Sequence, residues 1–313
     1  KVSARGMGKM QIYESSVVFI PNCDDAYVVY FNFMKKHEFD EDEYLLRIET
    51  DNGLKINVSR LGSSFDDARD VFEGCLEKMY QRVLNQLAKA VPGFSLQTLL
   101  KLAYVLRDGK CVSINQLKKI DAELPERLLD LAFKDNPPLQ DKIKLLRSLD
   151  KGEQFMLGFA FENDYKSKYD EVKVKSWFLV ALPEKNIIAI GISSDAANKD
   201  ILFFRIVMEQ GVASEKVDGK ILEMNQSMVL FEHELSPLYK DKNFLKKSRY
   251  KIALMKLAFL RLIRRSYLGK STAEDLESFK SDTVRFIEAA SILHKPQLRH
   301  RQMFRPQLNK KAN

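Results

Sequence analysis

The sequence has no long apolar run. Its longest apolar stretches, such as residues 177–182 and 201–204, have a charged residue within two positions on either side. Both fall far short of the roughly 20 residues that a helix needs to cross a bilayer. Residues 1–10 also lack the apolar segment of a secretion signal. The sequence therefore predicts no integral membrane insertion and offers no support for secretion.

Cysteine is scarce as well. Cys23, Cys75 and Cys111 are an odd number, widely spaced, and no two of them form a C-x-x-C pair. This pattern argues against a disulfide framework and against a cysteine zinc site. We expect ordinary reduced thiols in a cytoplasmic protein.

Signatures of catalysis are also missing. The four histidines, His37, His233, His294 and His300, form no H-x-x-x-H or H-E-x-x-H pair, which argues against a histidine metal site. There is no G-x-S-x-G nucleophile turn, and no G-x-G-x-x-G follows a predicted strand. We therefore predict no catalytic residue, no metal and no cofactor, and we lean away from an enzyme.

One short segment, Gly269–Lys270–Ser271, is similar to the end of a phosphate-binding P-loop. The glycine that this loop requires five positions earlier is replaced by Arg264. A P-loop also follows a strand, whereas residues 244–268 have helical periodicity. We predict a turn between two helices instead, in which the glycine follows the first helix and the serine caps the second, paired with Glu274.

The net charge of +8 is distributed unevenly. Residues 240–313 contain 11 Lys and 8 Arg against 6 acidic residues, a net +13, which leaves residues 1–239 at −5. A localised positive field attracts phosphates and acidic protein surfaces, although it does not determine a fold. The sequence therefore predicts an anionic partner for the C-terminal quarter of the chain.

Residues 9–61 are typical of short antiparallel strands. Residues 27–33 are rich in β-branched and aromatic side chains. Two further strand patterns, 44–50 and 54–58, flank Asp51–Asn52–Gly53. Asn-Gly is the strongest short-range signal for a hairpin because both residues accept positive φ. We predict a hairpin at this point.

The hydrophobic period changes after Leu61. Ser64 can cap a helix whose apolar positions recur at steps of three and four residues until Pro92–Gly93. We expect residues 95–149 to be mostly helical as well. The predicted helical segments in this connector are 96–106, 113–120 and 125–133.

Strand patterns return in the second half of the chain, at 154–161, 172–182, 186–192 and 201–208. Trp177 heads an apolar run and is predicted to lie in the core. The two β-rich blocks share an Arg-Ile step, at Arg47 and at Arg205, so an internal duplication stays open. The predicted fold class is α+β, with segments 1–92 (strands plus a long helix), 93–150 (helical connector), 151–239 (second β-rich module), 240–293 (basic helical region) and 294–313 (basic flexible tail).

Glu171–Val172–Lys173 matches the short E-x-K step of metal-dependent nucleases, in which acids hold a divalent ion and the lysine stabilises developing charge. Asp150 or Asp164 could complete such a site. The step is common in a chain with 30% charged residues, and the alternation of Lys173 and Lys175 with smaller and apolar residues is typical of a half-exposed strand.

The strongest candidate site is a set of basic residues in a predicted helix and in the tail that follows it. The predicted helix buries an apolar side that consists of Ile252, Met255, Phe259, Leu262 and Ile263. Several of the bases would then share the opposite face, which could also be merely a solvated face. The tail interleaves its bases with Phe304, a composition suited to phosphate contacts or to an acidic groove. The candidate binding residues are Lys246, Lys247, Arg249, Arg261, Arg264, Arg265, Lys270, Arg299, Arg301 and Arg305.

The order of elements resembles a known family. The stretch from Met10-Gln-Ile-Tyr to Leu61-Gly-Ser-Ser-Phe-Asp-Asp is similar to a pleckstrin-homology-like (PH-like) barrel. The block with Trp177-Phe-Leu and Leu202-Phe-Phe-Arg-Ile is similar to a second. The whole chain resembles uncharacterised bacterial proteins with two such barrels joined by helices. The resemblance implies a binding module for proteins, peptides or phosphoinositides, and it implies no particular functional residue.

We therefore expect a non-enzymatic binding or scaffold protein whose basic C-terminal region contacts nucleic acid or an acidic protein partner. One alternative is a metal-dependent nuclease centred on Glu171 and Lys173. Another is a subunit of a larger multiprotein assembly, in which the basic tail lies on a protein neighbour. The first expectation rests on the localised charge, and the nuclease alternative rests on a three-residue motif.

Overall fold

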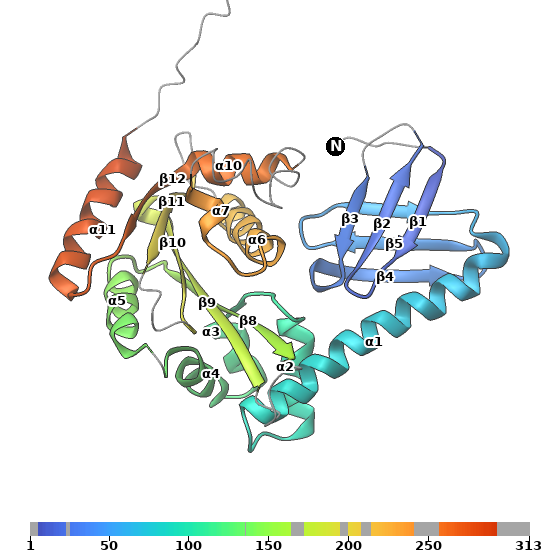
Figure 1. The fold of residues 1–313 in the computed structure, drawn as a ribbon, viewed down its shortest axis with the longest axis horizontal. Helices are drawn as coiled ribbons and strands as arrows, with labels where there is room; N and C mark the ends of the chain where they lie inside the picture. The colour runs from blue at the N-terminus through green and yellow to red at the C-terminus, as the bar shows by residue number, and fades with distance from the viewer. Residues whose placement is uncertain are drawn as a thin grey trace, which may run out of the picture.

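Helices and antiparallel sheets both contribute to the fold, as Figure 1 shows. The computed structural model describes residues 6–22, 26–134, 136–163, 172–194, 200–207, 214–240 and 257–292. Within these ranges, the strands form two three-stranded sheets and one six-stranded sheet. The predicted α+β class is confirmed. No helix of the described residues is both long and apolar enough to cross a bilayer.

Two small sheets and one long helix form the N-terminal module. The sheets are β1 (Gly8–Ile12), β2 (Ser16–Pro21) and β3 (Tyr27–Tyr30), then β4 (Met34–Asp40), β5 (Leu45–Thr50) and β6 (Lys55–Val58). Inward-facing Val17, Leu46 and Ile48 pack against Phe72 of helix α1 (Phe65–Ala90). The closing helix is confirmed, although the Ser64 side chain makes no capping hydrogen bond. The predicted strand 27–33 is confirmed only as far as Tyr30, because residues 31–33 form a 3-10 turn, and β4 was not predicted.

The predicted hairpin at Asn52–Gly53 is confirmed, since β5 and β6 pair antiparallel on either side of it. The Gly53 N–H donates to the Thr50 carbonyl at 2.9 Å, and Gly53 has a φ of 78°. Asn52 does not adopt positive φ. Its side-chain oxygen instead accepts hydrogen bonds from the Thr50 hydroxyl and from the Leu54 N–H. Only the glycine therefore uses the left-handed region here.

The six-stranded sheet is the centre of the larger module. In spatial order it contains β12 (Tyr267–Ser271), β11 (Ile201–Arg205), β10 (Ile187–Ile192), β9 (Val172–Leu182), β8 (Gln154–Asn163) and β7 (Val112–Ser113). Both segments predicted to be helical, 93–150 and 240–293, thus contribute a short strand at an edge. Within the ranges that the structure describes, no sheet closes into a barrel.

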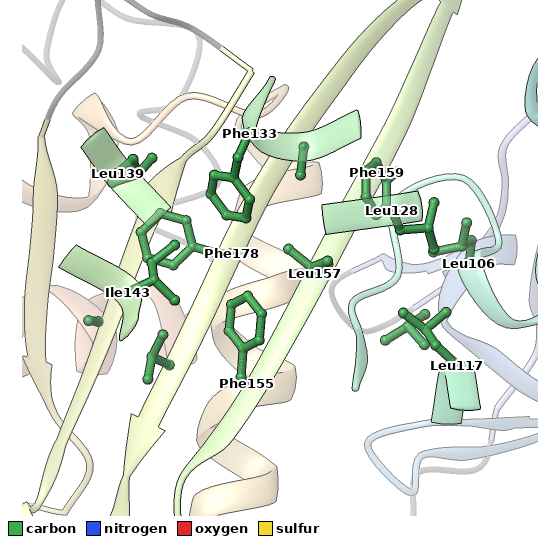
Figure 2. Packing of buried hydrophobic residues seen from close by; sticks show 14 of the residues in the cluster. Leu106, Leu117, Leu128, Phe133, Leu139, Ile143, Phe155, Leu157, Phe159 and Phe178 are labelled. Atoms are coloured by element: carbon green, nitrogen blue, oxygen red, sulfur yellow. The ribbon is translucent and has the colours of Figure 1, made fainter. Parts of the chain in front are cut away.

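Helices cover both faces of this sheet (Figure 1). One face carries α2 (Leu96–Leu106), α3 (Ile114–Ile120), α4 (Leu124–Phe133), α5 (Pro137–Ser148) and α11 (Leu276–Ser291), and the other carries α6 (Ser214–Leu230), α7 (Ser236–Tyr239) and α10 (Ala258–Ser266). Figure 2 shows Phe155, Leu157 and Phe178 of the first face packed among Phe133 and Ile143. Because both faces are buried, the strands are continuous apolar runs. The predicted helices 96–106, 113–120 and 125–133 are confirmed as α2, α3 and α4.

Trp177 lies in the core on the other face, as predicted, with 1% of its surface exposed. Its Nε1 donates to Cys111 Sγ at 3.1 Å, and its ring stacks on His233 with centroids 4.7 Å apart. A Cβ at Gly158 on the neighbouring strand would lie 2.2 Å from this ring. The glycine therefore makes room for the indole.

The prediction of a turn between two helices at Gly269 is wrong. Tyr267–Ser271 is a strand that pairs with β11, with Gly269 opposite Phe203. A Cβ at Gly269 would lie 2.3 Å from Cε1 of Phe286, so the position requires glycine because a ring of α11 packs on the strand. It is not the left-handed end of a helix.

The predicted cap of the following helix is also wrong. Ser271 is a strand residue whose hydroxyl donates to Asp282 Oδ2 at 2.7 Å. α11 begins at Leu276, and its N-cap is Asp275, whose Oδ1 accepts the Ser278 N–H at 2.7 Å. The nearer acidic cap thus replaces the predicted serine cap.

Candidate functional site

The structure describes four of the ten candidate binding residues. Arg261, Arg264 and Arg265 lie on α10, and Lys270 lies on the next element, β12. The predicted tail lies outside the described residues, and so do Lys246, Lys247, Arg249, Arg299, Arg301 and Arg305. For these six positions the binding role stays a prediction.

α10 is an amphipathic helix that rests on the six-stranded sheet. Leu260 and Ile263 are fully buried in the cluster that contains Trp177. Arg261 and Arg265 are exposed, and their spacing of four residues places them on the same outer face. The prediction that Leu262 is buried is wrong, because it lies next to these arginines and is 48% exposed. The outer face of the helix therefore carries two exposed arginine residues.

Arg264 has a different role from its two neighbours. It is only partly exposed, and its guanidinium donates to the carbonyl oxygens of Pro237 and Lys240. Pro237 lies in the first turn of α7, and Lys240 directly follows this helix. Arg264 therefore holds α10 against α7, and its donors are used within the protein.

Lys270 is neutralised by one of the protein's own carboxylates. Its Nζ lies 2.8 Å from Asp200 Oδ2 and 5.5 Å from the centre of the Tyr239 ring. The hydrogen bond to Asp200 raises the pKa of Lys270. This ion pair links β12 to the residue before β11, so Lys270 contributes less to an external positive field than the sequence suggests.

The residues of the nuclease alternative are not brought together. Glu171 and Asp164 lie outside the described residues. Asp150 is 3% exposed, and its carboxylate accepts the N–H groups of Gly152 and Glu184, each at 2.9 Å. Backbone amides thus satisfy this carboxylate. Where the structure is described, no group of three or more His, Cys, Asp or Glu side chains is placed to hold a metal ion.

A cleft of about 560 Å³ lies between α3, α6 and the edge of the six-stranded sheet, and it was not predicted from the sequence. Two ion pairs line it, Lys110 with Asp51 at 2.8 Å and Arg147 with Glu153 at 2.9 Å. The apolar residues along it include Phe155, Met156 and Ile221. Its volume is in the range of small-molecule pockets. No local pattern predicts it, because its walls come from four distant segments of the chain.

A strained loop beside this cleft joins the two modules. Arg107, Asp108 and Gly109 all have positive φ, at 44°, 51° and 118°. The Asp108 carboxylate pairs with Arg82 of α1 at 2.6 Å, and Arg107 donates to the Met34 carbonyl of β4. These contacts fix the N-terminal module on the larger one, and backbone strain of this kind is retained only where surrounding contacts impose it.

Cys111 follows this loop and is not a nucleophile candidate. The residue is 6% exposed, and burial raises the pKa of its thiol despite the hydrogen bond from Trp177. A thiol of this kind stays protonated and unreactive.

Comparison with family models, with curated proteins and with solved structures finds no match to this chain, so the candidate site rests on its geometry.

Proposed function

We propose that this chain is a non-enzymatic binding or scaffold protein whose basic C-terminal region contacts an anionic partner, either nucleic acid or an acidic protein surface. The observation that carries the proposal is the arrangement of α10. Arg261 and Arg265 are exposed one turn apart, while Arg264 holds the helix to two carbonyl groups. Arginine forms planar, paired hydrogen bonds with phosphates and carboxylates, so two exposed arginines one turn apart suit either partner.

The proposal also includes the identification of the two β-rich modules as PH-like. Two three-stranded antiparallel sheets followed by a long helix support a PH-like N-terminal module. The second PH-like module rests on the resemblance of residues 177–179 and 202–206. The cytoplasmic location is likewise proposed from the cysteine pattern, and Cys75 and Cys111 are both free thiols.

The test compares the full chain with the double variant Arg261→Glu/Arg265→Glu. Affinity for a labelled duplex DNA and for a labelled single-stranded RNA is measured over a series of salt concentrations. If both arginines contact phosphates, the slope of log affinity against log salt becomes shallower by about 2. The matched control is Lys118→Glu/Lys119→Glu, which reverses two exposed cations on α3 and leaves the affinity nearly unchanged.

One further result distinguishes a protein partner from nucleic acid, and another refutes the proposal. If neither nucleic acid binds, an acidic protein that co-purifies with the full chain and is released by Arg261→Glu/Arg265→Glu identifies the partner as protein. If every partner that binds is retained equally by this variant and by the control, α10 is not the contact surface and the proposal fails.

A further inference from the structure

A second surface lies on the outer side of helices α1 and α2, away from α10. Leu96, Leu100 and Tyr104 follow one another every fourth residue along α2, and they are 64%, 50% and 56% exposed. The opposite side of the same helix is buried in the main core through residues such as Leu99 and Leu102. Single exposed apolar residues are common on proteins, whereas an aligned set of large ones marks an interaction site.

The apolar stripe continues onto α1. Tyr104 stacks on Tyr80 with ring centroids 5.9 Å apart and the planes inclined by 15°. The Arg107 guanidinium lies 4.9 Å from the centre of the Tyr104 ring, and it also donates a hydrogen bond to the Met34 carbonyl. Tyr80, Leu96, Leu100 and Tyr104 are called the α1–α2 face below. Its aromatic end is thus held in place by neighbouring side chains.

A hollow of about 270 Å³ lies at the other end of the face, beside Leu96. It is formed by the turn between α1 and α2 together with the loop before α4. The lining residues include Pro92, Phe94 and Arg127, with Asp121 and Glu123 at the α4 side. The stripe therefore leads into a depression that can accept a side chain from a partner.

The chain around this face is basic. No Asp or Glu occurs between Glu77 and Asp108, although the protein contains 43 acidic residues among 313. The same stretch contains Lys78, Arg82, Lys89, Lys101 and Arg107. Arg82 is paired with Asp108, whereas Lys101 is exposed beside Leu100 and Tyr104. The segment that carries the apolar stripe therefore has a net positive charge, while Asp121 and Glu123 lie in the hollow at one end.

We propose that the α1–α2 face docks an acidic, amphipathic helix of a partner protein. Apolar residues at every fourth position form the ridge that a second helix packs against, and such a helix supplies anchors at matching intervals. Acidic residues beside those anchors complement the positive field of residues 78–107. This surface is separate from α10, and it binds through apolar anchors rather than through charge alone.

The surface is less suited to the other two possible occupants. A second copy of the chain would bring two positive faces together, which is unfavourable. An anionic membrane attracts dense clusters of about four to eight cations, whereas two of the five cations of residues 78–107 are bound within the protein, Arg82 to Asp108 and Arg107 to the Met34 carbonyl. The observations therefore favour a helix with its own acidic residues.

The experiment is a selection from a displayed library of helical peptides, each about 16 residues long or about four turns. Leucines are fixed along one face, and the other positions vary among Glu, Lys, Gln and Ala. The full chain is the bait, and enriched peptides are then titrated against the wild type and two variants. Leu100→Glu changes the centre of the face. Val71→Glu is the matched control, because Val71 is a 52% exposed apolar residue at the far end of α1.

We expect the enriched peptides to be rich in Glu and to bind the wild type and Val71→Glu equally. Leu100→Glu lowers their affinity by about tenfold or more, the effect of losing a central apolar contact. Because Leu100 is exposed, the variant keeps the fold, and this is verified by its circular dichroism spectrum. Arg261→Glu/Arg265→Glu leaves the peptide affinity unchanged. The proposal for α10 can therefore fail without affecting the proposal for the α1–α2 face, and the reverse also holds.

Several outcomes overturn the proposal. Enriched peptides with no excess of Glu, or with equal affinity for Leu100→Glu, show that the face does not select acidic helices. If no peptide binds, but phosphatidylserine vesicles bind the full chain and Leu100→Glu abolishes that binding, the face is assigned to a membrane. A dimer in sedimentation that Leu100→Glu dissociates assigns it to a second copy.

Discussion

Gly269→Ala is expected to destabilise the protein because β12 lies directly beneath an aromatic ring. A Cβ at this position would lie 2.3 Å from Cε1 and 2.8 Å from Cζ of Phe286, whereas ordinary contact begins at 3.4 Å. The ring has little room to move, since it is 5% exposed and stacks on Phe203 at a centroid distance of 4.6 Å. Overpacking of this kind costs about 1–3 kcal/mol.

The free energy of unfolding is measured by urea titration, followed by circular dichroism and by the fluorescence of Trp177, the single tryptophan. Phe286→Leu removes the two ring atoms that the new Cβ would meet. The double variant Gly269→Ala/Phe286→Leu therefore loses less stability than the sum of the single losses, by about 1 kcal/mol or more. If Gly269 ended a helix in the left-handed region, alanine would also be costly, but Phe286→Leu would not relieve that cost. Losses that add within about 0.5 kcal/mol would refute the packing argument.

Two further predictions concern Arg264 and His37. Arg264→Met lowers the free energy of unfolding by about 1–2 kcal/mol, because the carbonyls of Pro237 and Lys240 lose a charged donor, but it leaves the affinity of the folded protein for duplex DNA unchanged. A loss of affinity equal to that of Arg261→Glu/Arg265→Glu would place Arg264 in the binding surface instead. Burial against Phe72 lowers the pKa of His37, an effect that the nearby Glu73 opposes. The unfolded chain then binds this proton more readily, so stability is complete above the unfolded pKa of about 6.5 and falls as the pH drops towards the lower folded value. His37→Gln flattens this part of the stability profile, and an unchanged slope would contradict the assignment.

Local sequence predicts most of the helices and strands of this fold. The apolar spacing of α1 and the turn chemistry at Asn52–Gly53 act between near neighbours in the chain, so both are predicted correctly. β12 depends instead on contacts with residues far away in sequence. It pairs with β11, and the reason for Gly269 is the ring of Phe286. The helical periodicity of the preceding residues therefore extended the predicted helix across a strand.

The candidate sites were harder to predict because exposure is not encoded locally. Counting bases treats Arg264, Arg265 and Lys270 alike, yet only the packed structure shows which of them meets a carbonyl or a carboxylate. α2 was predicted as a helix, but it has apolar residues on both sides. Periodicity cannot say which side is covered, since that depends on where the other helices pack. The α1–α2 face follows from the exposure of Leu96, Leu100 and Tyr104.

The two proposed surfaces differ in their chemistry, and that difference determines how each responds to salt. Binding at α10 relies on two guanidinium groups, so it weakens steeply as salt screens them and competes for the phosphates. Binding at the α1–α2 face relies on apolar burial, which salt does not screen, so most of it persists when the electrostatic part is gone. α10 and α2 are well separated in Figure 1, which allows both surfaces to be occupied together. A scaffold must hold two partners at once. If this chain is a scaffold, the partner bound at α10 and the partner bound at the α1–α2 face do not displace each other.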